Sequence, residues 1–426
     1  MASAPETQSD PLDSFREEVR AWLGENFPKA LAHKDNGMSA IDGPDERTED
    51  QAAWQKAMGE KGWGVPTWPE AYGGGGLTRA QARVLQEEMN RIGAWNPIGG
   101  MGVMMFGPTL LEYGSEEQKQ EHIPGIAKGT VRWCQGYSEP GAGSDLASLQ
   151  MFAEDKGDHY LVNGQKTWTS GGQWAHKCFA LVRTDRAHKH AGISFLLIDM
   201  DAPGVEVKPI RLISGASPFC ETFFTDVKVP KGNLVGQEGQ GWAIGTRLLQ
   251  HERSSLSGGG STGRMMAGEA ISALAKKYRG VDEKGRLSDG DLRMRLVRHE
   301  MDARAFALTL RRAALEAKSN SGPSAATSIM KNVGARVTQE RAELGVEIMG
   351  MQGLGWEGEG FTEAELTQTR TWLWGKAVSI YGGSTEIQNN VIAKRILGMT
   401  EAGESSEQVG GSRKMGQERR ATPPPS

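Results

Sequence analysis

Residues 133–150 read WCQGYSEPGAGSDLASLQ, and the pattern of the chain changes at this stretch. Its glycine and proline turns could bring together the hydroxyl and backbone N–H groups of Ser138 and Ser144. Gly141 and Gly143 would let an anionic ligand approach the main chain closely. By residue type alone, the stretch fits an ordinary turn-rich loop at the start of a β domain better than a ligand site.

Downstream of this loop, short runs rich in β-branched and aromatic residues alternate with turn residues. Their lengths and spacing predict an antiparallel barrel or sandwich of about 100 residues. The runs, between residues 159 and 230, are HYLVNGQKTWTS, KCFALVRTD, AGISFLLIDM, VEVKPIRLI and ETFFTDVKVP.

The sequence on both sides of the β region has the periodicity of helices. The first clear pattern, PLDSFREEVRAWLGENFP, has a candidate capping box in Ser14 and Glu17. From Gly239 onward, long helical patterns with wide apolar stripes fit a four-helix bundle. The fold class is therefore α+β. We expect a disordered leader (1–10), an N-terminal helical domain (11–130), a middle β-barrel domain (131–237), a C-terminal helical bundle (238–400) and a disordered tail (401–426).

Composition narrows the class of protein. The 426 residues exceed one compact core, and the 24% charged and 38% hydrophobic residues are ordinary for a soluble chain. A net charge of −4 without a basic cluster argues against nucleic acid as a partner. The three scattered cysteines, Cys134, Cys178 and Cys220, favour a reducing compartment and no structural metal. Without a secretory signal or an apolar run of about 18 residues, we expect a cytoplasmic protein with no membrane span.

Two glycines interrupt a helical pattern near the C-terminus. Residues 380–388 read IYGGSTEIQ, and each glycine within a helix costs about 1 kcal/mol relative to alanine. The chain has no P-loop or HExxH motif. The glycine pair therefore needs another explanation than these sites.

Seven motifs together resemble the acyl-CoA dehydrogenase family, in the family's order, over residues 12–399. That resemblance implies an N-terminal helical domain, a middle β-barrel and a C-terminal four-helix bundle, usually in a tetramer that binds FAD. The motifs are GWGVPTWPEAYGGGG, YGSEEQKQEHIPGIAKG, YSEPGAGSD, KTWTSGG, VPKGNLVGQEGQGW, VEIMGMQGLGW and IYGGSTEIQNNVIAKRILG.

The resemblance implies a flavin site. Ser138 and Ser144 match positions that contact the flavin ring edge and the pyrophosphate. Trp168 matches a residue that packs against the isoalloxazine, and Ser170 one that bonds near N5; without the motif, Trp168 would be read as a core aromatic. The remaining matches are Tyr137, Gly143 and Thr169 beside the flavin, Glu347, Ile348, Met349, Gly350 and Met351 at the adenosine half of a neighbouring subunit's FAD, and Ser384 and Glu386 near the same cofactor.

The implied reaction converts an acyl-CoA to its trans-2-enoyl-CoA, a step of fatty acid β-oxidation. A carboxylate removes the α proton while a hydride leaves the β carbon for flavin N5. Because that proton is weakly acidic, the site must hold the thioester oxygen with donors and exclude water from the base. Electrons would then pass to an electron-transferring flavoprotein.

The usual position of the catalytic glutamate in this family holds Gly382. Members that resemble isovaleryl-CoA and long-chain dehydrogenases carry the base on the first bundle helix instead, before an arginine, and Glu252 precedes Arg253 here. We therefore expect Glu252 as the base and the Gly382 N–H as a donor to the thioester oxygen. The alternative is a solvated Glu252 paired with Arg253 or His251. The implied substrate contacts are Ser144, Arg253, Tyr381, Gly382 and Gly383.

The chain departs from the family pattern at two places. KKYRGVDEKGRLSDGD replaces an RxxFG segment, and Arg279 and Arg286 are both open as substitutes for its arginine. Glu347 stands where glutamine is common. These departures leave open a non-catalytic or scaffolding subunit, and a heterotetramer rather than a homotetramer; an oxidase that uses oxygen is a further alternative. Glycines in SGGGSTG favour a branched or bulky substrate.

Overall fold

The computed structural model describes residues 11–34, 46–257, 270–319 and 327–399. They divide into two compact units: Met1–Leu212 with Ala216–Gly258, and Ile213–Gly215 with Gly259–Ser426. The predicted disordered leader and tail lie outside the described residues. Each unit is treated by itself below.

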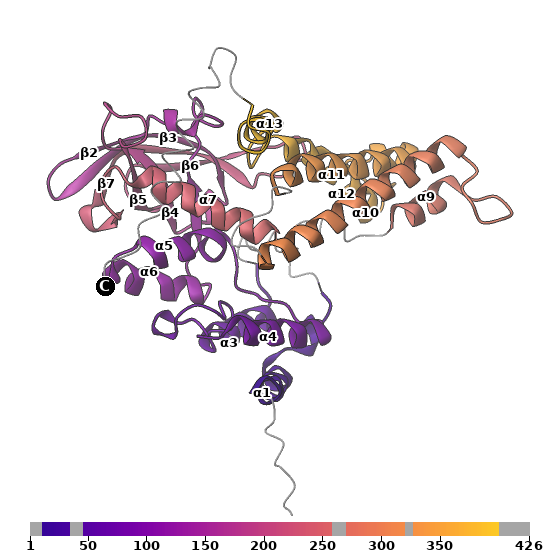
Figure 1. Ribbon diagram of the computed structural model, residues 1–426, viewed down its shortest axis with the longest axis horizontal. Helices are drawn as coiled ribbons and strands as arrows, with labels where there is room; N and C mark the ends of the chain where they lie inside the picture. Colours follow the sequence, from indigo (N-terminus) through magenta and orange to yellow (C-terminus); the bar gives the residue numbers. More distant parts are fainter. Residues whose placement is uncertain (1–10, 35–45, 258–269, 320–326, 400–426) are drawn as a thin grey trace, which may run out of the picture. The chain divides into compact units, whose positions relative to one another are not determined.

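Unit 1 begins with three helices around an aromatic core: α1 (Pro11–Asn26), α3 (Glu49–Glu60) and α4 (Arg79–Arg91) (Figure 1). Threonine capping boxes start α3 and α4. The capping box expected at Ser14 is wrong, because α1 already starts at Pro11, a residue favoured in the first turn of a helix. The buried core includes Val19, Leu23, Trp54, Met58 and Leu85.

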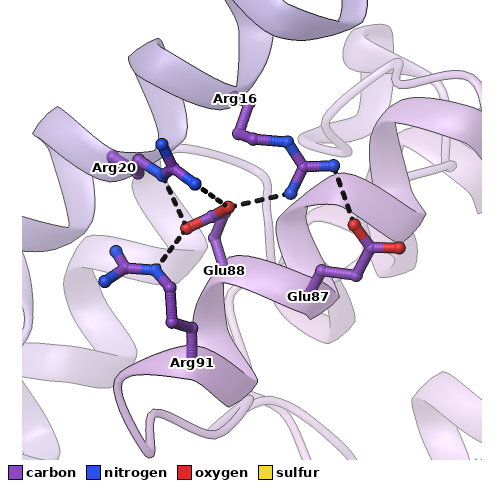
Figure 2. A network of polar contacts seen from close by, with 5 residues as sticks. All are labelled: Arg16, Arg20, Glu87, Glu88 and Arg91. Carbon is purple, nitrogen blue, oxygen red and sulfur yellow. Dashed lines mark hydrogen bonds and ion pairs between the residues drawn. The ribbon is translucent and has the colours of Figure 1, made fainter.

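A buried carboxylate joins α1 to α4 (Figure 2). Only 2% of the Glu88 side chain is exposed, and it accepts hydrogen bonds from Arg16, Arg20 and Arg91 at 2.6–3.0 Å. Arg16 also binds Glu87 at 2.8 Å. Hydrogen bonds from the arginines, Arg20 first, lower the pKa of Glu88 to about 2. A buried charge is tolerated only with such partners, so this network fixes α1 on α4.

The sheet of unit 1 has eight strands in the order β6-β7-β3-β2-β4-β5-β8, with β1 beside β4. Pairing is antiparallel except between β1 and β4 and between β2 and β4. The five predicted runs correspond to β3 through β7. The strands are β1 (Trp133–Gly136), β2 (Phe152–Asp155), β3 (His159–Ser170), β4 (Lys177–Arg183), β5 (Ile193–Asp199), β6 (Val205–Ile210), β7 (Phe219–Pro230) and β8 (Leu234–Val235).

Helices cover this sheet within the same unit (Figure 1). They are α5 (Gly107–Tyr113), α6 (Glu116–Ala127) and α7 (Gly241–Ser257). Ile244 and Leu248 of α7 are buried in one cluster with Phe179 and Phe195 of the sheet. Contacts thus group α7 with unit 1, although the sequence pattern assigned it to the bundle.

Unit 2 is helical and is organised around α11 (Thr327–Met349), which packs against α9, α10, α12 and α13. Its buried core includes Leu292, Leu296, Leu344 and Ile348. With the N-terminal helices and the middle sheet of unit 1, this helical region completes the α+β fold expected from the sequence. The remaining helices are α9 (Ile271–Arg279), α10 (Gly290–Ser319), α12 (Glu363–Gly375) and α13 (Thr385–Val391).

Two kinds of feature do not occur in the described parts of the chain. No helix there is long and apolar enough to cross a membrane. The same residues contain no group of three or more His, Cys, Asp or Glu placed to hold a metal ion.

Candidate functional site

The loop after β1 is a tight turn with an open tip. Glu139 and Ala142 exchange backbone hydrogen bonds of 3.0 Å, which place Pro140 and Gly141 at the tip. A Cβ atom at Gly141 or Gly143 would meet no atom within 4 Å. The main chain of this loop is therefore open to a ligand, as the glycine pattern predicted.

Two buried polar side chains, those of Lys166 and Glu139, hold the loop in place. Lys166 is 0% exposed and Glu139 is 7% exposed. The Lys166 Nζ atom donates to a Glu139 carboxylate oxygen at 2.8 Å and to the Tyr137 carbonyl at 3.2 Å. The same carboxylate accepts the backbone N–H groups of Gln150 and Met151 at 2.6 and 2.9 Å. The loop is thereby tied at its start and at its end.

Trp168 lies in β3 at an irregular point in the sheet. The pairing of β3 with β7 shifts register between Lys166 and Thr169, and Trp168 has a φ of 60°. A bulky side chain in the left-handed region is strained. The bulge turns the indole outward: it is 55% exposed and meets Phe219 edge-on at 6.0 Å. The reading of Trp168 as a core aromatic is therefore wrong.

The loop and the bulge lie side by side in unit 1. The backbone N–H of Thr167 donates to the Ser138 carbonyl at 2.8 Å. Ser138 and Ser170 are half-buried, Ser144 is exposed, and Thr169 is buried. Tyr137 is 5% exposed and packs edge-on against Phe179 and Phe195.

The ring of Tyr137 packs into the core, so this residue contributes only its main chain to the loop surface. Together these residues form a surface with one flat aromatic side chain, the hydroxyl groups of Ser138, Ser144 and Ser170, and an open glycine turn. A flat aromatic ring that carries an anionic tail, such as a flavin nucleotide, fits this combination.

The expected base lies on α7. Glu252 and Arg253 belong to this helix, but their side chains lie outside the described residues. The preceding His251 places Nε2 at 3.2 Å from an oxygen of Glu112, which Arg247 binds through two hydrogen bonds of 2.8 Å. Those bonds from Arg247 are the main cause that lowers the pKa of Glu112.

The C-terminal end of α11 in unit 2 carries the residues expected near adenosine. The Glu347 carboxylate forms two hydrogen bonds of 2.6 and 2.5 Å with Arg295 of α10. Arg279 donates to the Glu347 carbonyl at 2.5 Å, whereas Arg286 binds Asp282 in its own loop at 3.0 Å. Arg279, rather than Arg286, therefore lies at this helix end, and the charge of Glu347 has a partner.

The four residues that follow Glu347 differ in exposure. Ile348 and Met349 are buried, at 1% and 5% exposed. Gly350 has a φ of 59°, and Met351 is 79% exposed. Only Met351 of the three side chains in this stretch is thus accessible to a ligand.

The glycine pair of residues 382 and 383 forms the turn before α13. Gly382 has a φ of 65° and Gly383 a φ of 91°, a region that disfavours other residues. A Cβ at Gly382 would meet no atom within 4 Å, whereas one at Gly383 would meet Gln388 at 2.6 Å. Backbone conformation is thus one physical reason for the pair. Tyr381 is 47% exposed just before it.

Two polar residues lie at the start of α13, directly after the glycine pair. The Ser384 hydroxyl caps α13 by accepting the Ile387 N–H at 3.4 Å. Glu386 is exposed in the first turn, and its hydrogen bond to a backbone N–H there lowers its pKa. Within unit 2 the expected residues lie at two separate places, because α13 binds near the start of α11, through Asn389 and Asn332 at 2.8 Å, whereas Glu347 lies near the end of that helix.

Sequence reasoning missed Lys166, Glu139 and Arg295. A signal for Lys166 existed, because it occupies an inward position of a strand pattern whose other inward residues, such as Tyr160 and Val162, are apolar. A lysine on the buried face of a strand needs a partner. No sequence signal identifies that partner or the pair of Arg295 with Glu347, since both contacts join distant segments.

Comparison with known proteins gives matches over most of the chain. Family models described as the N-terminal, middle and C-terminal domains of acyl-CoA dehydrogenase match residues 9–130, 134–227 and 239–397. Acyl-CoA dehydrogenase IpdE1 of Mycolicibacterium smegmatis is 36% identical over 402 residues, covering 91% of this chain and 98% of that protein. The IpdE1 protein of Mycobacterium tuberculosis is 35% identical over 395 residues, with the same coverage of 91% and 98%.

Solved structures resemble the chain over similar lengths. The structure titled Tcur3481-Tcur3483 steroid ACAD has a TM-score of 0.71 and 30% identity, and covers 94% of this chain and 100% of that one. The ChsE4-ChsE5 complex from Mycobacterium tuberculosis gives 0.69 and 29%, with coverage of 94% and 100%.

Proposed function

Because the chain belongs to the acyl-CoA dehydrogenase family, we propose that it oxidises an acyl-CoA thioester to the trans-2-enoyl-CoA with FAD. The domains of this enzyme would span residues 11–130, 131–237 and 238–400. The observation that carries the proposal is Trp168, an exposed aromatic held in a strained backbone beside the open glycine loop. Strain and exposure of this kind are typical of a ligand-binding position.

FAD, when bound, accepts the hydride that leaves the β carbon of the substrate. This chain's residues would bind and orient it. Trp168 offers a flat face to the ring, and the hydroxyl groups of Ser138 and Ser170 offer hydrogen bonds to its edge. The open main chain at Gly143 and the exposed Ser144 would receive the pyrophosphate. In unit 2, the stretch from Glu347 to Met351 would contact the adenosine half of a neighbouring subunit's cofactor, and Ser384 and Glu386 would lie near the same cofactor.

Glu252 is proposed as the base that removes the α proton. Its carboxylate gains basicity where water is excluded, and the Gly382 N–H would hold the thioester oxygen and make the α proton more acidic. Arg253, Ser144, Tyr381 and the main chain at Gly383 are the proposed substrate contacts.

The proposed substrate is a ring-bearing or otherwise bulky acyl-CoA. This is supported by solved relatives whose titles name a steroid ACAD, and by the glycine-rich sequence SGGGSTG that follows the proposed base in the chain. An electron-transferring flavoprotein is the proposed electron acceptor. The titles of solved relatives name two chains together, which supports a heterotetramer as an alternative to a homotetramer.

The test of the base is the Glu252→Gln variant, titrated anaerobically with acyl-CoA while the flavin absorbance is followed. The variant is expected to bind FAD and acyl-CoA but to reduce its flavin at least a hundredfold more slowly than the wild type. Reduction at the wild-type rate would exclude Glu252 as the base. Oxygen consumption during aerobic turnover tells an oxidase from a dehydrogenase.

A further inference from the structure

We propose that Lys166 is a positioning residue for the flavin, because it ties the strand that carries Trp168 to the loop that carries Ser138. The inference rests on the proposed function in one respect, the identity of the ligand. Lys166 itself is fully buried and cannot touch a bound cofactor. It acts through the main-chain carbonyl of Tyr137 and the side-chain carboxylate of Glu139.

Lys166 contacts the residues on both sides of Ser138, which belongs to the proposed flavin surface. Its Nζ atom binds the carbonyl of Tyr137 at 3.2 Å and the carboxylate of Glu139 at 2.8 Å, so it holds the residues before and after Ser138. The next residue in its own strand, Thr167, donates to the Ser138 carbonyl at 2.8 Å. One side chain and one backbone bond thus fix Ser138 against β3.

The position of Lys166 in β3 lets it influence how the Trp168 indole is held. The register of β3 on β7 is lost between Lys166 and Thr169, so the sheet does not fix the backbone at Trp168. Lys166 is the last residue in register before this gap, and Thr169, with 0% exposure, is the first after it. The two buried ends hold the exposed, left-handed Trp168 between them.

Lysine is an energetically unfavourable residue at this buried position. Burial of an ammonium group is unfavourable unless it is paired, and an apolar residue of similar volume is often as stable. Desolvation lowers the pKa of Lys166, and the nearby Glu139 opposes this effect. If the role of Lys166 were purely structural, an apolar residue in its place would therefore serve equally well, provided that the residue at position 139 were also neutral. A positioning role would not, because only the ammonium group can bind the Tyr137 carbonyl.

This contrast defines the experiment. Lys166→Met removes the ammonium group and leaves the Glu139 carboxylate buried without its cation, so the variant is expected to be less stable. Lys166→Met combined with Glu139→Gln removes both charges and is expected to recover part of that stability, because the amide keeps only one oxygen for the two backbone N–H groups that the carboxylate accepts. Glu139→Gln alone is measured beside it to separate this loss from that of the ammonium group. Lys177→Met is the matched control. Lys177 is also a paired lysine of this sheet, but within the described part of the chain it binds Asp199, at 2.5 Å, rather than any of residues 137–139.

The readouts are the thermal midpoint of the flavin-free proteins, the affinity of each for added FAD, and the absorbance and fluorescence of the bound flavin. We expect the double variant to unfold between Lys166→Met and the wild type, and to bind FAD at least tenfold more weakly than Glu139→Gln alone, with flavin fluorescence less quenched by Trp168. The control is expected to match the wild type in FAD affinity and in flavin spectrum.

A double variant that binds FAD with wild-type affinity and spectrum would overturn the positioning role and leave Lys166 structural. A wild-type protein that binds no FAD would overturn the proposed function, and this inference with it. The two failures are distinguishable, because the first requires a wild type that binds flavin.

Discussion

Trp168 is the residue at which local structure departs most from what its residue type predicts. Among the described Phe, Tyr and Trp side chains of this unit only those of Trp168 and Tyr113 are exposed, and tryptophan disfavours a left-handed backbone. The bulge in β3 holds it outward, and the energy of this strain is supplied by the sheet around it. Sequence alone gave two readings of this residue, since the bulge depends on pairing with β7.

Trp168→Gly should separate fold from ligand binding. Relief of left-handed strain is worth about 1–2 kcal/mol, which offsets the chain entropy that glycine adds. The free energy of unfolding of the flavin-free protein is therefore expected to stay within about 1 kcal/mol of the wild type. FAD affinity is expected to fall at least tenfold, and Trp168→Phe is the control that keeps an aromatic face. Unchanged FAD affinity in the glycine variant would show that the indole does not bind the flavin.

Gly382 is expected to be needed for its backbone conformation. At a φ of 65°, alanine costs about 1 kcal/mol or more, so Gly382→Ala should lower the free energy of unfolding by this amount in urea. Gly360→Ala is the control, because a Cβ there also meets no atom within 4 Å and its φ is not in the left-handed region. Equal effects of the two substitutions would remove backbone strain as the explanation.

At the scale of elements, the sequence predicted the long strands and missed the short ones. The strands β3 and β7 alternate inward and outward residues over enough length to be recognised. The strands β4 and β5 are instead almost wholly buried, and their continuous apolar runs identify them. The strands β1, β2 and β8 have four, four and two residues, and so few residues carry no period. Parallel pairing of β1 with β4 joins distant segments and has no local signature.

The contact between α1 and α4 should depend on Glu88 alone among the acidic residues of α4. Glu88→Gln removes a buried charge bound by three arginines and is expected to lower the free energy of unfolding by about 2 kcal/mol. Glu87→Gln is the matched control, because half of the Glu87 side chain is exposed, at 50%, and such pairs contribute less than about 1 kcal/mol. Urea denaturation measures both, and equal losses would contradict this account.

The same contact predicts a pH dependence. The pKa of Glu88 falls from its ordinary 4.5 to about 2 on folding, so folding favours the ionised carboxylate. This contribution is fully present above the unfolded pKa and is lost as the pH falls from about 4.5 to about 2. Relative to the wild type, Glu88→Gln should therefore lose less stability between pH 5 and pH 3. Parallel stability curves for the two proteins in this range would contradict the assignment.

At the scale of the whole molecule, the order of helices, strands and helices was predictable because each region has its own period over many residues. The grouping of α7 with the sheet was not predictable, because its helical pattern is equally compatible with packing in a bundle and with packing on a sheet. Its buried residues Ile244 and Leu248 pack with strand residues, and only tertiary contacts reveal that. The contacts that define the candidate site, such as Lys166 with Glu139, likewise join positions 27 residues apart.

The measurement that tests the central claim most directly is an anaerobic titration of the purified wild-type protein, reconstituted with FAD, with straight-chain, branched and ring-bearing acyl-CoAs. We expect bound FAD, loss of its absorbance near 450 nm on addition of a ring-bearing acyl-CoA, as is general for a two-electron reduced flavin, and formation of one enoyl-CoA per flavin reduced. A protein that binds FAD but whose absorbance no acyl-CoA of the panel changes would contradict the proposed dehydrogenase.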